Sequence, residues 1–114
     1  MRVLICSSCA GARDLPAERQ AISDALRAAG LDGQVEIAEH ACFSGCDEPT
    51  VVAMQGESLA SYVFSGIDPV ADADDIAATC RTILNSPNGW IEDARPCGRL
   101  RLCLRARIPA FQST

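Results

Sequence analysis

The sequence of 114 residues has one histidine, five aromatic residues and no long apolar run. A Rieske centre needs two histidine ligands, so that kind of site is excluded. We find no Ser-His-Asp set, no phosphate-cradling glycine loop and no nucleotide fingerprint, which argues against a self-contained hydrolase or dehydrogenase. The apolar run at the N-terminus is too short for a signal-peptide core, and no stretch approaches the roughly 20 apolar residues of a membrane span. We therefore expect a soluble, cytoplasmic protein.

The scarcity of aromatic residues restricts the kind of core that the chain can build. Hydrophobic residues make up 48% of the sequence and aromatic residues only 4%. We therefore expect a core of valine, isoleucine, leucine and alanine. The length suits a single domain over residues 1–114, and it is small enough for a bound metal centre to contribute noticeably to stability.

Acidic residues are absent from the last part of the chain. Residues 95–114 hold five arginines and no acid, which gives +5, whereas residues 1–94 hold fifteen acids and five arginines, which gives −10. An acidic body argues against nucleic acid as the main partner. It favours docking on the basic surface of a partner protein, mainly by electrostatic steering.

Seven cysteines are present, and four of them form two close pairs: Cys6 with Cys9, and Cys42 with Cys46. An odd number leaves one thiol outside any complete disulfide framework, and a reducing compartment opposes such bonds. Two short pairs of soft sulfur ligands suit an iron–sulfur cluster or a structural zinc ion. A dithiol redox couple is the other reading, although a redox Cys-x-x-Cys normally opens a helix. Here the first predicted helix begins only near Pro16.

The pattern of apolar residues places both pairs after strands. Residues 3–5 form a short buried strand, residues 16–29 an amphipathic helix and residues 34–40 an alternating strand. A strand, helix and strand of this length form a right-handed crossover, in which both strands end at the same edge of the sheet. We therefore expect the two cysteine pairs to converge at that edge.

The rest of the chain predicts a larger sheet, a second helix and an extended tail. Residues 50–54 and 58–64 read as strands around a turn at 55–57, and a helix opens at Asp68-Pro69 and stops near residue 86. In the tail, residues 99–108 alternate arginine or cysteine with apolar residues, which predicts an extended segment with one apolar face. Cys80 falls on the buried face of the second helix and is expected in the core. His40 is expected to be an ordinary residue at a strand end.

The two cysteine segments, CSSC at 6–9 and ACFSGCDEPTVV at 41–52, resemble those of the thioredoxin-like [2Fe-2S] ferredoxins. The chain is also similar to a family of small bacterial metal-binding proteins often encoded near cobalamin-biosynthesis genes. That similarity continues through residues 62–64, 68–69, 86–90 and 107–109, and so covers nearly the whole chain.

The resemblance implies an α/β fold with a thioredoxin-like β-α-β-β-β-α mixed sheet, or a close variant, and an extended C-terminal segment. It also implies a homodimer whose [2Fe-2S] cluster is held by Cys6, Cys9, Cys42 and Cys46 and transfers one electron, without enzymatic turnover, to redox partner proteins. The first pair is spaced more tightly than in the better-known thioredoxin-like ferredoxins. Zinc or cobalt handling on the same thiolates, linked to cobalamin biosynthesis, therefore remains an alternative. Cys97 and Cys103 lie outside the pattern, as a spare thiol or an alternative ligand.

Overall fold

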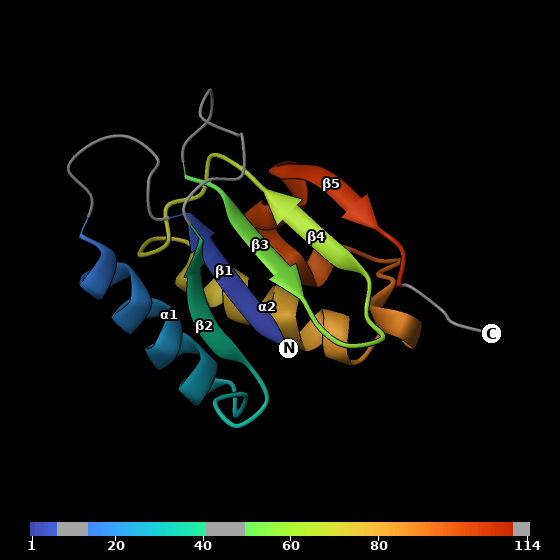
Figure 1. Cartoon of the computed structure of the whole chain (residues 1–114), viewed down its shortest axis with the longest axis horizontal. Coiled ribbons are helices and arrows are strands. Elements are labelled where there is room, and N and C mark those ends of the chain that lie inside the picture. Colours follow the sequence, from blue (N-terminus) through green and yellow to red (C-terminus); the bar gives the residue numbers. More distant parts are fainter. Residues whose placement is uncertain (7–13, 41–49, 111–114) are drawn as a thin grey trace.

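A five-stranded mixed sheet forms one layer of the molecule (Figure 1). The computed structural model describes residues 1–6, 14–40 and 50–110. The strand order is β2-β1-β3-β4-β5, where β1 and β2 are parallel and all other neighbours are antiparallel. The bounds are β1 (Arg2–Cys6), β2 (Glu36–His40), β3 (Val52–Gln55), β4 (Ser61–Phe64) and β5 (Leu104–Ile108).

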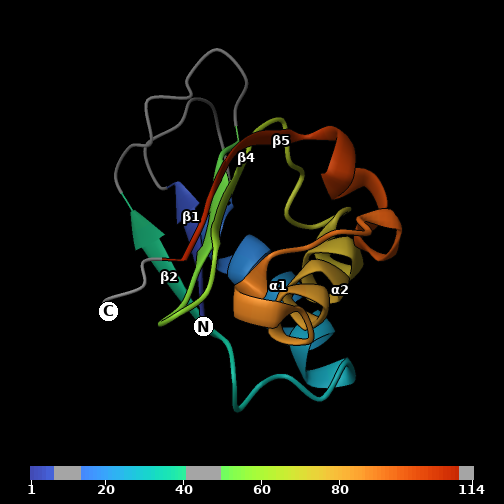
Figure 2. The same ribbon diagram turned by 90° about the vertical axis from the view of Figure 1, so that its right-hand side faces the viewer.

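Both α-helices lie on one face of this sheet (Figure 2). Helix α1 (Leu15–Ala28) connects β1 to β2, and α2 (Ala73–Leu84) follows β4. Two 3-10 segments, η1 (Pro87–Gly89) and η2 (Arg95–Leu102), lead from α2 to β5. The predicted β-α-β-β-β-α order is thus confirmed, with a further strand at the C-terminus, and the arrangement is compatible with a thioredoxin-like α/β fold. No helix in the described ranges has the length and apolarity needed to cross a membrane.

Helix α1 matches its predicted position to within one residue at each end. The Asp14 side chain accepts a hydrogen bond from the N–H of Ala17 at 3.1 Å, which satisfies one donor of the first turn. Pro16 stands in that turn, where its missing N–H costs nothing. The helix stops before Gly30, whose φ of +74° favours glycine. Its face toward the sheet is formed by Glu18, Ile22, Ala25 and Leu26.

Helix α2 begins later than the sequence predicts, at Ala73 instead of near Asp68. The Asp68 side chain accepts hydrogen bonds from the backbone N–H groups two and three residues further on, which closes a separate turn. The Asp72 carboxylate accepts from the N–H of Asp68 at 2.9 Å, so it does not cap the helix that follows. Proline at position 69 therefore opens a turn and not the helix.

The hairpin between β3 and β4 has a longer loop than predicted. The strands end at Gln55 and resume at Ser61, so residues 56–60 replace the expected turn at 55–57. The N–H of Ala60 donates to the carbonyl of Asn88 at 2.8 Å instead of joining the strand ladder. This long-range hydrogen bond shortens β4 at its start.

The core lies between the sheet and the two helices and is mainly aliphatic, as expected. Tyr62 and Phe64 are the aromatic residues buried in it, with parallel rings whose centroids are 6.2 Å apart. The Tyr62 hydroxyl donates to the carbonyl of Gly89 at 2.6 Å and accepts from the N–H of Ile91 at 2.9 Å, so this buried polar group is satisfied. The largest fully buried aliphatic side chains of this core are Ile5, Ile22, Leu26, Met54, Ile76, Ile83 and Leu100.

The C-terminal tail is only partly extended, which corrects the prediction for residues 99–108. Residues up to Leu102 belong to η2, and only Leu104–Ile108 form a strand. Gly98 has φ of +61°, and a Cβ at this position would clash with the carboxylate of Asp75. The same carboxylate accepts from the N–H of Arg99 at 3.1 Å. Contact with α2 therefore bends the chain here, and no single apolar face results, since Leu100 is buried and Leu102 is exposed.

Arg99 attaches the C-terminal segment to the start of α2. Its Nε donates to Asp72 Oδ1 at 3.0 Å, and one terminal nitrogen donates to Asp72 Oδ2 at 2.5 Å and to the carbonyl of Gly66 at 2.8 Å. The Asp72 carboxylate is nearly buried, whereas Arg99 keeps part of its side chain in solvent. The hydrogen bond from Arg99 lowers the pKa of Asp72 below its usual value, against the opposing effect of burial.

Substituting Asp72→Asn should lower the free energy of unfolding by about 1–3 kcal/mol at neutral pH, because the charged hydrogen bonds to Arg99 are weakened. A lowered carboxyl pKa in the folded state stabilises the protein above the unfolded pKa, and this stabilisation disappears as the pH falls. The difference between wild type and variant should therefore shrink below about pH 4. Urea unfolding at several pH values measures it.

The matched control is Asp32→Asn, which changes the same chemical group at an exposed position. Asp32 makes no ion pair with any residue that the structure describes. Its substitution should leave the free energy of unfolding within about 0.5 kcal/mol of wild type. Equal losses in the two variants would contradict the role assigned to the Asp72–Arg99 pair.

Candidate metal centre

Cys6 is the last residue of β1, a strand with a neighbour on each side. On one side it pairs with His40, the last residue of β2, in the parallel ladder. On the other side its N–H donates to the carbonyl of Val51 at 3.0 Å, just before β3 begins. Cys6 thus lies between the end of β2 and the start of β3; Figure 1 shows β1 between these two strands.

The expected meeting of the two strand ends is confirmed, and the remaining cysteines follow those ends in sequence. Cys9 lies three residues beyond β1 and Cys42 two residues beyond β2. His40, the last residue of β2, lies about one strand spacing, roughly 4.8 Å, from Cys6 in the ladder. Cys9, Cys42 and Cys46 lie outside the described residues. Their role as ligands together with Cys6 stays a prediction.

The Cys6 side chain is buried in apolar surroundings. It has no exposed surface, and it packs with Val51 and the half-buried Val63 in a cluster distinct from the core under the helices. Val3 and Ile5 of β1 belong to that helix-side core, so alternation places Cys6 on the other face of the sheet. A buried, soft sulfur donor beside apolar side chains suits a metal centre shielded from water.

The backbone around this edge of the sheet is held by further hydrogen bonds. The carbonyl of Thr50, where the chain returns from the second cysteine segment, accepts from the N–H of Ile67 at 3.1 Å. The N–H of Ser65 donates to the carbonyl of Cys103 at 3.0 Å. The turn after β4 therefore ties the start of β3 to the start of β5 at the edge where Cys6 lies.

Of the cysteines outside the two pairs, Cys80 and Cys97 are buried and Cys103 is half-buried. Cys80 belongs to the core, as predicted, with its sulfur 4.0 Å from that of Met54. Burial raises the pKa of Cys80 to about 12. Cys97 also lies in the main core, and Cys103 precedes β5. Within the described ranges, no group of three or more histidine, cysteine, aspartate or glutamate side chains is placed to hold a metal ion.

The start of α1 bears on the dithiol reading. The helix begins at Leu15 and its N-cap residue is Asp14, five residues after Cys9. A redox Cys-x-x-Cys gains its acidic thiolate from the N-terminus of a helix that it opens. The described helix does not provide such a position, because its cap is already occupied by the Asp14 side chain.

Surface hollows lie away from Cys6. One of about 580 Å³ runs between α1 and β2, with Arg19, Leu26 and Ile37 in its lining. Another, of about 540 Å³, lies at the opposite end of β1 and is lined by Met1, Gln55 and other mainly polar residues. Neither is lined by a cysteine from the described part of the chain.

Residues 3–110 match the family DUF1636, which is described as "Protein of unknown function". The chain belongs to this family. Because the match spans both helices and all of the sheet except the first residue of β1, the fold described above is the fold of the family's domain in this chain. No curated protein and no solved structure matches the chain. The likeness to thioredoxin-like ferredoxins therefore stays a prediction from the cysteine segments.

The native protein should show a clear order of thiol reactivity. At pH 8, a thiol with a pKa of about 12 is ionised in only about one molecule in ten thousand, and burial blocks access as well. Iodoacetamide should modify Cys103 and leave Cys80 unmodified, as measured by peptide mass spectrometry.

Urea-unfolded protein is the control, in which both thiols should react. Modification of Cys80 as fast as Cys103 in the folded protein would show that α2 does not bury this thiol.

Proposed function

We propose that this protein is a one-electron carrier whose [2Fe-2S] cluster is bound by Cys6, Cys9, Cys42 and Cys46. When bound, such a cluster supplies a one-electron couple shared by its two iron ions. The cysteine thiolates hold the cluster, and the chain itself turns over no substrate.

The position of Cys6 is the observation that supports this proposal most directly. Its backbone is paired with His40 on one side and bonded to Val51 on the other. The segment that carries Cys42 and Cys46 leaves from beside Cys6 and returns beside Cys6. The described strand ends thus support a common site for Cys6 and for the three cysteines that follow these ends in the sequence.

The surroundings of Cys6 would protect such a centre. Val51 and Val63 pack against its side chain and exclude water on this side. Solvent exposure and hydrogen bonds to sulfur set the reduction potential of a cluster. An apolar shell around the ligands also limits the access of water to the cluster. A buried cysteine at a strand end is also a rigid ligand, because the ladder on both sides fixes its backbone.

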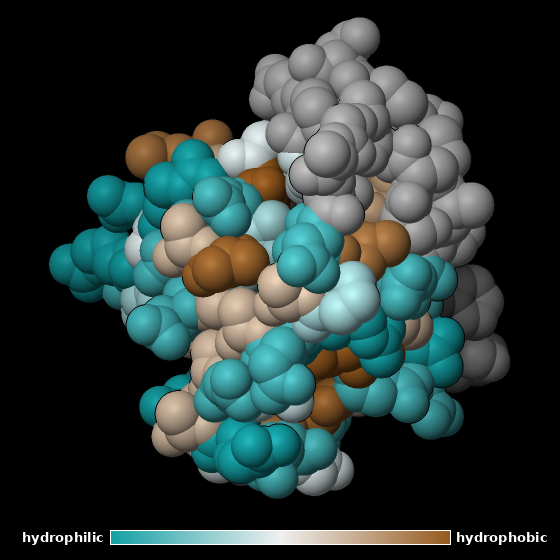
Figure 3. Space-filling model, turned by 90° about the vertical axis from the view of Figure 1, so that its left-hand side faces the viewer, coloured by the Kyte–Doolittle hydropathy of each residue, from teal (hydrophilic) through white to brown (hydrophobic). Residues whose placement is uncertain are grey.

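The charge distribution supports a partner with a basic docking surface. Residues 1–94 carry a net charge of −10. The side of the molecule that carries α1 and β2 shows many hydrophilic residues with some apolar ones between them in the space-filling view (Figure 3). Asp24, Glu36 and Glu39 on this side are each paired with an arginine. Asp14 and Asp32, near the two ends of α1, are exposed and form no ion pair with a described residue. Such a surface speeds encounter with a basic redox partner, more than it adds to affinity.

The alternative is a zinc- or cobalt-handling protein that uses the same thiolates, linked to cobalamin biosynthesis. The tight Cys-x-x-Cys spacing of Cys6 and Cys9 favours it, since structural zinc sites use such pairs. The resemblance further implies a homodimer. We also propose a cytoplasmic location, where a reducing environment keeps thiols available for a metal.

Anaerobically purified protein should contain about two iron and two acid-labile sulfide per chain, and should show visible absorption whose intensity falls on reduction. Reduction by dithionite should give an electron paramagnetic resonance signal from one unpaired electron. Cys6→Ala should lose most of the iron and sulfide, because one of the four ligands is gone.

The matched control is Cys103→Ala, which removes a thiol near the same sheet edge but outside the two pairs. It should retain iron, sulfide and absorption at wild-type levels. A colourless protein with about one zinc per chain would refute the electron-transfer proposal and support the alternative.

A further inference from the structure

Strand β5 forms one edge of the sheet, and only one of its two sides is paired. It hydrogen-bonds to β4, and the strand order places no other described strand beyond it. All five of its residues are exposed. An edge of this kind presents a row of N–H and C=O groups that can pair with a further strand.

Arginine and apolar residues alternate along the sequence of β5. Arg107 pairs with Tyr62, a core residue, and so lies on the helix side of the sheet. Ala106 and Ile108 pair with Val63 and Ser61 and lie on the side without helices. A bulge opposite Val63 and Phe64 interrupts this alternation between Ala106 and Leu104. The exposed fractions of Leu104 and Ile108 are 42% and 56%, so a strand added beside β5 would meet both positive charge and apolar surface.

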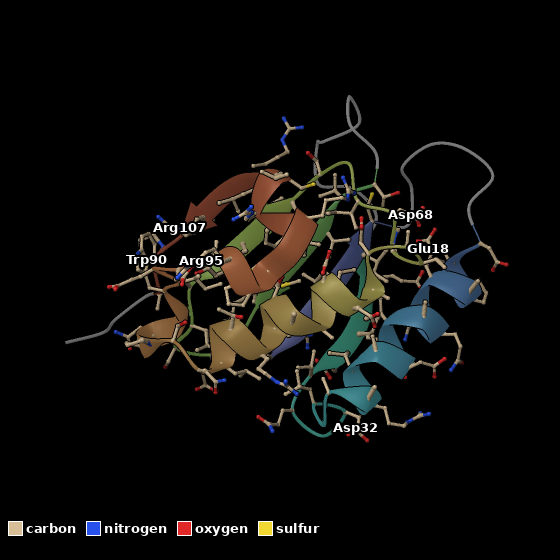
Figure 4. All side chains as sticks on the ribbon, turned by 180° about the vertical axis from the view of Figure 1, so that it is seen from behind. Glu18, Asp32, Asp68, Trp90, Arg95 and Arg107 are labelled. Atoms are coloured by element: carbon tan, nitrogen blue, oxygen red, sulfur yellow. The ribbon has the colours of Figure 1, made fainter. Side chains whose placement is uncertain are left out.

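One of these arginines is held in place for such a contact. The guanidinium of Arg107 lies over the Trp90 ring, 3.7 Å from its centroid, and donates to the carbonyl of Ile91 at 3.0 Å. Figure 4 shows Arg107 and Trp90 side by side. Stacking and a carbonyl acceptor orient the side chain without neutralising its charge.

The acids of this chain leave part of the positive charge uncompensated. Arg95 pairs with Asp93, and Arg99 pairs with Asp72. Arg105 and Arg107 form no ion pair with any described residue, on a chain whose net charge is otherwise strongly negative. This edge is thus a basic surface opposite in sign to the rest of the molecule.

The charge of β5 also argues against a second copy of the chain as the occupant. Two β5 strands side by side would bring four arginines together, and like charges across a strand pair are destabilising. Glutamate or aspartate in a partner segment would instead neutralise Arg105 and Arg107, while apolar residues of that segment would cover Leu104 and Ile108.

We propose that β5 is a docking edge for an extended segment of a partner protein that carries both acidic and apolar residues. Main-chain hydrogen bonds hold the segment, and its acids and apolar side chains set the specificity. This surface goes beyond the proposed electron transfer and does not depend on it, because the metal content of the protein should not change when the edge is altered.

The test uses a fluorescein-labelled peptide in which glutamate alternates with valine, titrated with the full-length protein and followed by fluorescence anisotropy. Binding should weaken as the salt concentration rises. Arg105→Glu should weaken it by about tenfold or more, since attraction becomes repulsion. The same variant should bind a peptide of alternating lysine and valine better than wild type does.

The matched control is Arg27→Glu, an equal charge reversal on α1, beside the opposite edge of the sheet (Figure 1). It should change peptide affinity by less than about twofold.

A peptide with N-methyl groups on alternate residues tests strand pairing, because it keeps the charges and removes backbone donors. It should bind much more weakly than the unmodified peptide. Circular dichroism and metal content confirm that each variant is folded and loaded as wild type.

Three results would overturn the proposal. The first is equal binding of the N-methylated peptide, which would mean charge contact without strand addition. The second is self-association, seen by sedimentation, that Arg105→Glu abolishes, which would assign the edge to a second copy. The third is absence of peptide binding together with Arg105-dependent binding to phosphatidylserine vesicles, which would assign the edge to a membrane surface.

Discussion

The pairing of β1 with neighbours of opposite direction determines where Cys6 lies. Its parallel neighbour β2 ends beside Cys6, and its antiparallel neighbour β3 starts beside Cys6. A parallel neighbour alone would bring one strand end to this edge. The antiparallel neighbour adds the point where the chain returns. The segment that connects them is thereby anchored at both ends within one strand spacing of a buried thiol.

The parts of the fold that could be predicted from sequence are those governed by local rules. Asp14 caps the start of α1, Pro16 fixes φ in its first turn, and Gly30 takes the positive φ that follows its end. These local signals predict the helix to within one residue at each end. Parallel pairing of β1 and β2 followed from the length of their connection. Cys80 was placed in the core because of its helical spacing.

The errors had local and distant causes. Helix α2 begins late because the Asp68 side chain closes a separate turn with the residues that follow it. Asp72 looks like part of an acidic helix start, but Arg99, 27 residues later, binds its side chain. The alternation of residues 99–108 resembles one strand, yet Asp75 bonds the backbone at Arg99 and keeps the first half in η2. Of the four predicted ligands, only Cys6 falls within the described residues. The strand topology was therefore open to prediction, whereas the tertiary hydrogen bonds were not.

The strands differ in how they would come apart. Strand β5 is hydrogen-bonded to the sheet through β4 alone, whereas β1 is hydrogen-bonded to a strand on each side. Tension applied at the C-terminal end of the chain would therefore break the hydrogen bonds between β5 and β4 one after another. β1, with its buried thiol, would separate only after β4 and β3.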